Sequence, residues 1–239
     1  MTEEFLEHLC KHYATEPGVR DLEQCAERII GDFLLRYERE GIQSRTYGSS
    51  DIELLFGKKA AITRTVAAAP GQAKTIVCFE HKASQALMQA CRAKGTGKFA
   101  VYGATTEYHK DCCSVAYECV KRLTRYNFES VDITLYITSY LPAITQNYLG
   151  CAAFMAIMSA ITNRKLPPNA VYLGGCDLSG NLFWDEIKLT SVINCAESAG
   201  DAVLYGPVGL AALTKEMGPV MIAESFNAAI LFEISAEHE

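Results

Sequence analysis

A cysteine at the start of an apolar helix is the first residue of this sequence that could do chemistry. Cys151 follows Gly150 and opens an apolar run that continues to Ile161. The positive end of a helix dipole lowers the pKa of a thiol, and a thiolate is a competent nucleophile. The same position also suits a core residue, because cysteine packs well as a small apolar side chain. Cys151 is therefore a candidate nucleophile, with a role in the core as the alternative.

The other reactive side chains form no recognisable metal site. The chain has 10 cysteines but no C-x-x-C pair, and His12, His81 and His109 are isolated from one another. Zinc sites bring several such ligands together at short, regular spacings. Asp185 and Glu186 are adjacent carboxylates, which is typical of a solvated turn. We therefore expect reduced thiols and no metal cofactor.

Composition and charge exclude several classes of protein. The chain of 239 residues has a net charge of −6, and its basic residues are scattered along the sequence, which disfavours nucleic-acid binding. No apolar run reaches the ~18 residues that a membrane span requires, and no signal sequence follows Met1. We expect a soluble, cytoplasmic protein with no membrane partner.

The first part of the sequence predicts a small helical unit. Apolar residues recur at helical spacing in 2–13 and 19–37, and Ser49, Ser50 and Asp51 offer an N-cap for a short helix that ends at Gly57. Lys58 and Lys59 begin a linker. The predicted domains are therefore 1–57, which is helical, and 60–239.

The second domain alternates between strand and helix patterns. Pro70 and Gly71 separate the first two predicted strands and indicate a hairpin. The predicted strands are 61–68, 73–79, 99–102, 131–137, 171–173, 181–183 and 202–204. The predicted helices are 106–123, 149–162, 187–198, 208–216 and 225–232. This alternation predicts an α/β (α+β) domain, with a mixed sheet because its first strands are joined by a hairpin.

Four motifs, in this order along the chain, carry a family resemblance. They are Tyr13–Glu23, Gly97–Gly103 followed by a helix, Ala156–Thr162, and the pair Gly174 and Gly180 with five residues between them. Together they resemble the C-terminal end of Lon-type AAA+ proteases. The resemblance implies the helical tail of an ATPase small subdomain, followed by the proteolytic domain.

The first motif implies a nucleotide contact. In it, Arg20 is similar to the sensor-2 arginine, whose guanidinium would approach the phosphates of ATP. The sequence contains no G-x-x-x-x-G-K-[ST] loop. We therefore expect no cofactor in this chain itself, and ATP with Mg²⁺ only together with an upstream ATPase module.

The resemblance also implies where a catalytic Ser-Lys dyad would lie, and both positions are substituted. In the family, the serine lies two residues before the glycine that precedes the apolar helix. That glycine is Gly150 here, so the serine position is Tyr148. The ungapped register past Gly180 places Ser191 at the lysine position. A phenol with a pKa of ~10 is a poor acyl acceptor at neutral pH. Lys188, about one helical turn away, is the alternative base, and a one-gap alignment would bring it closer.

Two functions follow from these substitutions. The first is an inert Lon-like domain, a pseudoprotease that acts as an oligomerisation or peptide-binding platform, with self-association into a hexameric ring and an upstream AAA+ ATPase as partners. The alternative is an active ATP-dependent peptidase of protein substrates that uses Lys188 and an unconventional nucleophile. A third, more distant interpretation is a Lon-like domain of a phage-defence ATPase.

Overall fold

The structure, a computed structural model of the whole chain, divides into two compact units, Met1–Thr63 and Arg64–Glu239. It describes residues 1–12, 20–57, 67, 69–79, 82–103, 106–139, 149–184, 192–193, 195–196, 203–214 and 221–236. The domain boundary at 57 to 60 stays a prediction. None of the described helices is long and apolar enough to cross a membrane.

The described residues of the first unit form three helices, as the helical spacing and the N-cap signal at 49–51 predict. They are α1 (Glu3–His12), α2 (Arg20–Glu40) and α3 (Ser49–Phe56). Their apolar faces meet in a small core that consists of Phe5, Leu9, Cys25, Ile29, Tyr47 and Ile52. The Gly48 N–H donates to the Asp51 carboxylate over 2.9 Å, which caps the start of α3.

The second unit is built on a mixed sheet of four strands. They are β1 (Gln72–Phe79), β2 (Lys82–Lys94), β3 (Phe99–Tyr102) and β4 (Val131–Ser139). The spatial order is β1-β2-β4-β3, with β3 parallel to β4 and the other neighbours antiparallel. The predicted fold class, α/β with a mixed sheet, is confirmed.

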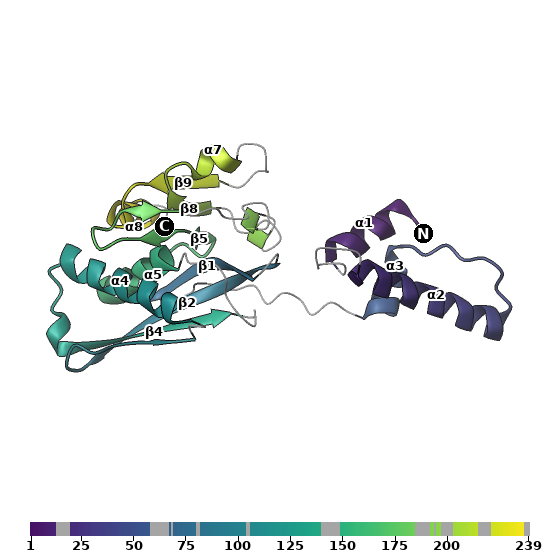
Figure 1. Cartoon of the computed structure of the whole chain (residues 1–239), viewed down its shortest axis with the longest axis horizontal. Coiled ribbons are helices and arrows are strands. Elements are labelled where there is room, and N and C mark those ends of the chain that lie inside the picture. Colours follow the sequence, from purple (N-terminus) through teal and green to yellow (C-terminus); the bar gives the residue numbers. More distant parts are fainter. Residues whose placement is uncertain are drawn as a thin grey trace. The chain divides into compact units, whose positions relative to one another are not determined.

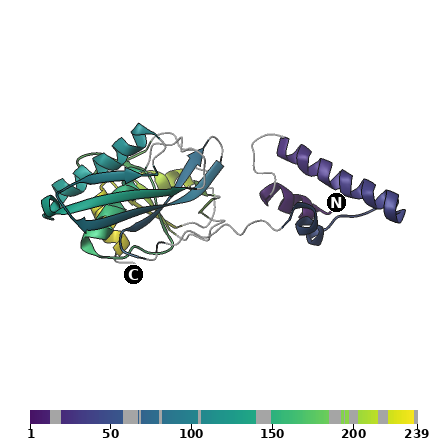
Figure 2. The same ribbon diagram turned by 90° about the horizontal axis from the view of Figure 1, so that it is seen from below.

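Helices α4 (Glu107–Leu123) and α5 (Gly150–Thr162) cover one face of this sheet (Figures 1 and 2). Side chains alternate between the two faces of a strand, so Met88 and Ala90 of β2 and Leu135 and Ile137 of β4 are buried beneath the helices. Every residue of α5 from Gly150 to Ile161 is buried. A helix that is apolar on all sides needs a second layer on its other side.

A second, parallel sheet supplies that layer. It consists of β5 (Ala170–Tyr172), β8 (Val203–Pro207) and β9 (Met221–Ser225) in the order β5-β8-β9. The short strands β6 (Gly175–Cys176) and β7 (Leu182–Phe183) form a separate pair. The described part of the unit also contains helices α7 (Leu210–Thr214) and α8 (Ala228–Ala236) and the 3-10 turn η1 (Phe128–Ser130). Tyr172, Tyr205 and Phe232 join the core around α5.

The structure differs from the sequence predictions at β2 and at the start of α8, and one predicted strand stays untested. The strand that pairs with β1 is β2, which the sequence analysis did not assign. The helix predicted from Ser225 begins at Ala228, because Ser225 ends β9 and its hydroxyl bonds the backbone of Asn227. The strand predicted at 61–68 lies outside the described residues, apart from Ala67.

Candidate active-site region at the start of α5

The start of α5 is docked tightly against the segment around β6. A Cβ atom added to Gly150 would lie 2.7 Å from the backbone nitrogen of Cys176 and 3.3 Å from its Sγ. The Cys151 N–H donates to the Gly174 carbonyl over 2.9 Å. The first turn of α5 therefore uses one of its unpaired amide groups to bind the protein itself.

The observed start of α5 lies within one residue of the predicted start at 149. The helix begins at Gly150, and the preceding residue, Leu149, is fully buried. By sequence, Tyr148 precedes the helix by two residues. Tyr148 itself lies outside the described residues, so its assignment to the serine position stays a prediction.

The other proposed dyad residues also lie outside the described part of the chain. These are Ser191 and Lys188. The residues that follow Ser191, Val192 and Ile193, are helical and buried in an apolar cluster that includes Ile76 of β1. Arg20 begins α2, but its side chain is not among those described, and its contact with a nucleotide stays a prediction.

Cys151 occupies an environment that opposes a thiolate. Its side chain is 0% exposed, and burial raises the pKa of the thiol far above its ordinary value. Desolvation also raises the pKa of Cys176 well above the ordinary value, with the nearby thiols of Cys151 and Cys119 adding to that shift. Burial raises the pKa of Cys119 to about 11. Desolvation therefore outweighs the helix dipole here, which favours the core role of Cys151.

Alkylation tests this assignment directly. On the folded chain at neutral pH we expect iodoacetamide to modify the exposed Cys91 and to leave Cys151 and Cys176 unmodified. A buried thiol reacts only through transient opening, so its rate should be lower by about 100-fold or more. Peptide mass spectrometry over a time course measures each rate. If Cys151 were modified as fast as Cys91, Cys151 would again be a candidate nucleophile.

Metal-ligating side chains do not converge in the part of the unit that the structure describes. Over those residues, no group of three or more His, Cys, Asp or Glu side chains could hold a metal ion. The structure does reveal one charged residue that the sequence analysis did not single out. Lys74 of β1 is fully buried, and by strand alternation it shares a face with Ile76 and Cys78. A lysine inside an otherwise apolar strand is the sequence signal that could have identified it.

Comparison with known proteins identifies relatives of one kind. The chain is 25% identical over 189 residues to a Lon protease of Malacoplasma penetrans. The aligned region covers 76% of this chain and 24% of that protein. The chain is 21% identical over 189 residues to a Lon protease of Mycoplasma genitalium, with the same two coverages of 76% and 24%. A Lon protease of Koribacter versatilis is 24% identical over 195 residues, again covering 76% and 24%.

These similarities extend over three quarters of the chain and confirm its resemblance to Lon proteases. The chain spans about a quarter of the length of the curated relatives it matches, at 24% in each case. No protein-family model matches the sequence.

Proposed function

We propose that the second unit is a Lon-type proteolytic domain that no longer hydrolyses peptide bonds and that acts as an assembly or peptide-binding platform. The similarity to Lon proteases and the mixed α/β fold support the first half of this proposal. The residues at the dyad positions support the second half. The ATPase module and the ring of subunits would come from the rest of a longer protein and from further copies of it.

The observation that carries the proposal is the register of α5. The helix begins at Gly150, so the residue that would attack the substrate is Tyr148, a phenol. Ser191, at the lysine position, has no amine that could accept a proton. Acyl transfer through a serine requires both the nucleophile and an adjacent general base. A domain that lacks both keeps the fold and its surfaces but loses the reaction.

The alternative is an active peptidase that uses Lys188 as its base. The burial of Cys151 weakens this alternative, because the thiol nearest to the expected site is desolvated and protonated at neutral pH. Lys188 would then have to activate a residue on another segment.

A peptidase assay on the full chain tests the proposed function. We expect no turnover of fluorogenic peptides or of labelled casein above that of a heat-denatured sample, with or without ATP. Labelled casein should still bind the chain, which fluorescence anisotropy measures. Turnover that disappears in Lys188→Met and persists in the control Lys165→Met, a change at an exposed lysine, would establish the alternative.

A further inference from the structure

A basic groove lies at the end of the four-stranded sheet where the chain passes from β2 to β3 and from α4 to β4. It has a volume of about 410 Å³ and is lined by Arg92, Ala93, Lys94, Tyr126, Ser130 and Val131. This volume falls within the range of small-molecule sites, which is about 300–1,000 Å³. The groove lies in the second unit, and none of the described residues that line it adjoins a dyad position in the sequence.

One wall of the groove presents two cations. Arg92 and Lys94 are two residues apart on β2, so their side chains project from the same face of the strand, and both are exposed. The Arg92 Nη1 donates to the carbonyl of Ile161, at the end of α5, over 3.4 Å. This contact orients the guanidinium and leaves its remaining N–H groups for a ligand.

The part of the groove around Tyr126 is held in place by aromatic contacts. The ring of Tyr126 meets that of Phe128 at 69° with 5.0 Å between the centroids, and Phe128 meets Tyr117 at 90° and 5.4 Å. The Gly95 N–H donates to the Ser130 carbonyl over 3.0 Å, which ties the two chain segments together. The ring of Tyr126 is thus held in place beside the groove, and the Ser130 hydroxyl donates to the Asn127 carbonyl over 3.5 Å.

The described carboxylates near the groove form other contacts than ion pairs with Arg92 and Lys94. Asp132 accepts the backbone N–H groups of Thr96 and Lys98 over 2.8 and 2.9 Å, and these bonds hold its pKa below the ordinary value. Glu118 pairs with Lys121 at 3.0 Å. Within the described residues, neither Arg92 nor Lys94 has an ion pair with a carboxylate.

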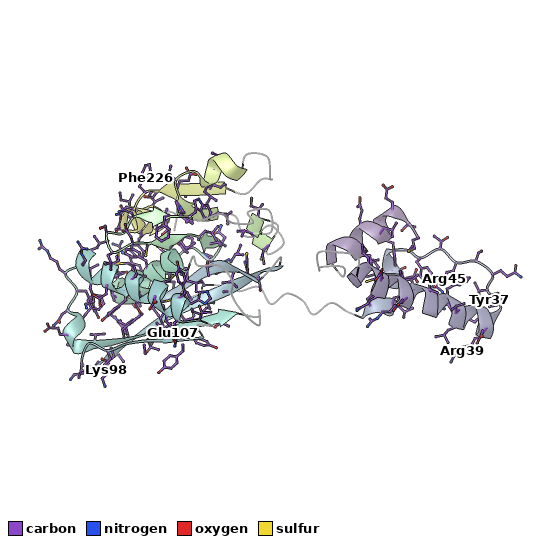
Figure 3. All side chains as sticks on the ribbon, in the orientation of Figure 1. Tyr37, Arg39, Arg45, Lys98, Glu107 and Phe226 are labelled. Carbon is purple, nitrogen blue, oxygen red and sulfur yellow. The ribbon has the colours of Figure 1, made fainter. Side chains whose placement is uncertain are left out.

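Further positive charges surround the groove. Arg125 adjoins Tyr126 in the sequence and is exposed, as is Arg122 at the end of α4. Lys98, labelled in Figure 3, is exposed at the same end of the sheet. This end therefore carries a local excess of positive charge in a chain whose net charge is −6. Such a patch attracts multiply charged anions.

We propose that the basic groove binds the phosphate groups of a small phosphorylated ligand. The guanidinium of Arg92 suits two oxygens of one phosphate, and the Lys94 ammonium adds a point charge for a second. The hydroxyl of Tyr126 donates to a remaining oxygen. Two cations side by side favour a ligand with several charges over a single carboxylate. The phosphate chain can come from a nucleoside triphosphate or from an inorganic polyphosphate.

Isothermal titration of the full chain with inorganic tripolyphosphate, and separately with ATP, tests the proposal. We expect saturable binding of tripolyphosphate that weakens as salt rises. The double variant Arg92→Gln, Lys94→Gln should weaken binding by about tenfold or more, which corresponds to about 1.4 kcal/mol. Equal affinities for the two ligands would assign recognition to the phosphates alone, and tighter binding of ATP would add a contact with its nucleoside.

The matched control is Arg28→Gln, Arg39→Gln, which removes the same charge from exposed positions on α2 and should change the affinity by less than about twofold. Lys94→Gln alone serves as a second variant, because it leaves the Arg92 contact with Ile161 intact; a severalfold loss is expected. The absence of saturable binding, or binding that survives loss of both groove cations, would overturn the proposal. Neither result changes the outcome expected in the peptidase assay. The proposed function and the phosphate-binding groove can therefore be refuted independently.

Discussion

Tyr148→Ser combined with Ser191→Lys is expected to create a serine that a fluorophosphonate probe labels, whereas the unaltered chain stays unlabelled. The two changes together would place an alcohol and an amine at both dyad positions of a fold that begins α5 at Gly150. A positioned general base accelerates attack by about 10²–10⁴-fold. Labelling at residue 148, measured by peptide mass spectrometry, should therefore rise from background to a clearly stoichiometric level.

Single substitutions provide the controls for this experiment. Tyr148→Ser alone lacks the amine and Ser191→Lys alone lacks the alcohol, so neither should be labelled above background, because the two groups act as a unit. Strong labelling of Tyr148→Ser alone, abolished by adding Lys188→Met, would assign the base to Lys188 and support the one-gap alignment. No labelling of the double variant, with the fold intact, would show that the ungapped register is wrong.

Local sequence signals were sufficient for most of the helices. For α4, Thr106 was the expected first residue, and its side chain accepts the His109 N–H over 3.3 Å as an N-cap. For α5, the continuous apolar run predicted a buried helix and gave its bounds within one residue. Caps and periodicity are properties of adjacent residues, so a single sequence contains them.

Strands whose stability depends on distant partners were not predictable in this way. The residues of β2 are rich in Ala, Gln, Leu, Met and Lys, which favour helices in isolation. In the fold, β2 pairs with β1 on one side and with β4 on the other over most of its length. These pairings and the burial of Met88 outweigh the intrinsic preference. Strand β9 was missed for the same reason, because its stability depends on pairing with β8.

At the candidate site, too, local features were predictable from the sequence and long-range packing was not. The apolar run predicted a helix from residue 149, one residue before the observed start of α5 at Gly150. The sequence could not show that Cys176, which is distant in the sequence, closes over that start and leaves Cys151 desolvated. The choice between a dipole-activated thiol and a core thiol depends on this long-range packing, which only the three-dimensional structure reveals.

That packing predicts a large loss of stability for Gly150→Val. Even the Cβ atom of alanine would lie 2.7 Å from the Cys176 backbone nitrogen, and a backbone atom cannot rotate away as a side-chain end can. Overpacking of a dense core costs about 1–3 kcal/mol, and the branched side chain should place valine at or above the upper end. The apparent Tm should fall by roughly 2–4 °C per kcal/mol for a unit of this size. The single tryptophan, Trp184, packs in the second unit, so its fluorescence reports unfolding of that unit.

Gly150→Ala and Gly31→Ala separate the steric effect from the helical preference for alanine. At Gly150 the gain in helix propensity, up to about 1 kcal/mol, opposes the clash, so alanine should destabilise less than valine. Gly31 lies inside α2 with no atom within 4 Å of an added Cβ. Gly31→Ala should therefore strengthen helical circular dichroism on heating and leave the Trp184 transition unchanged. If Gly150→Val melted at the same temperature as the unaltered chain, α5 would not be docked on Cys176. The register that assigns Tyr148 to the serine position would then lose its structural support.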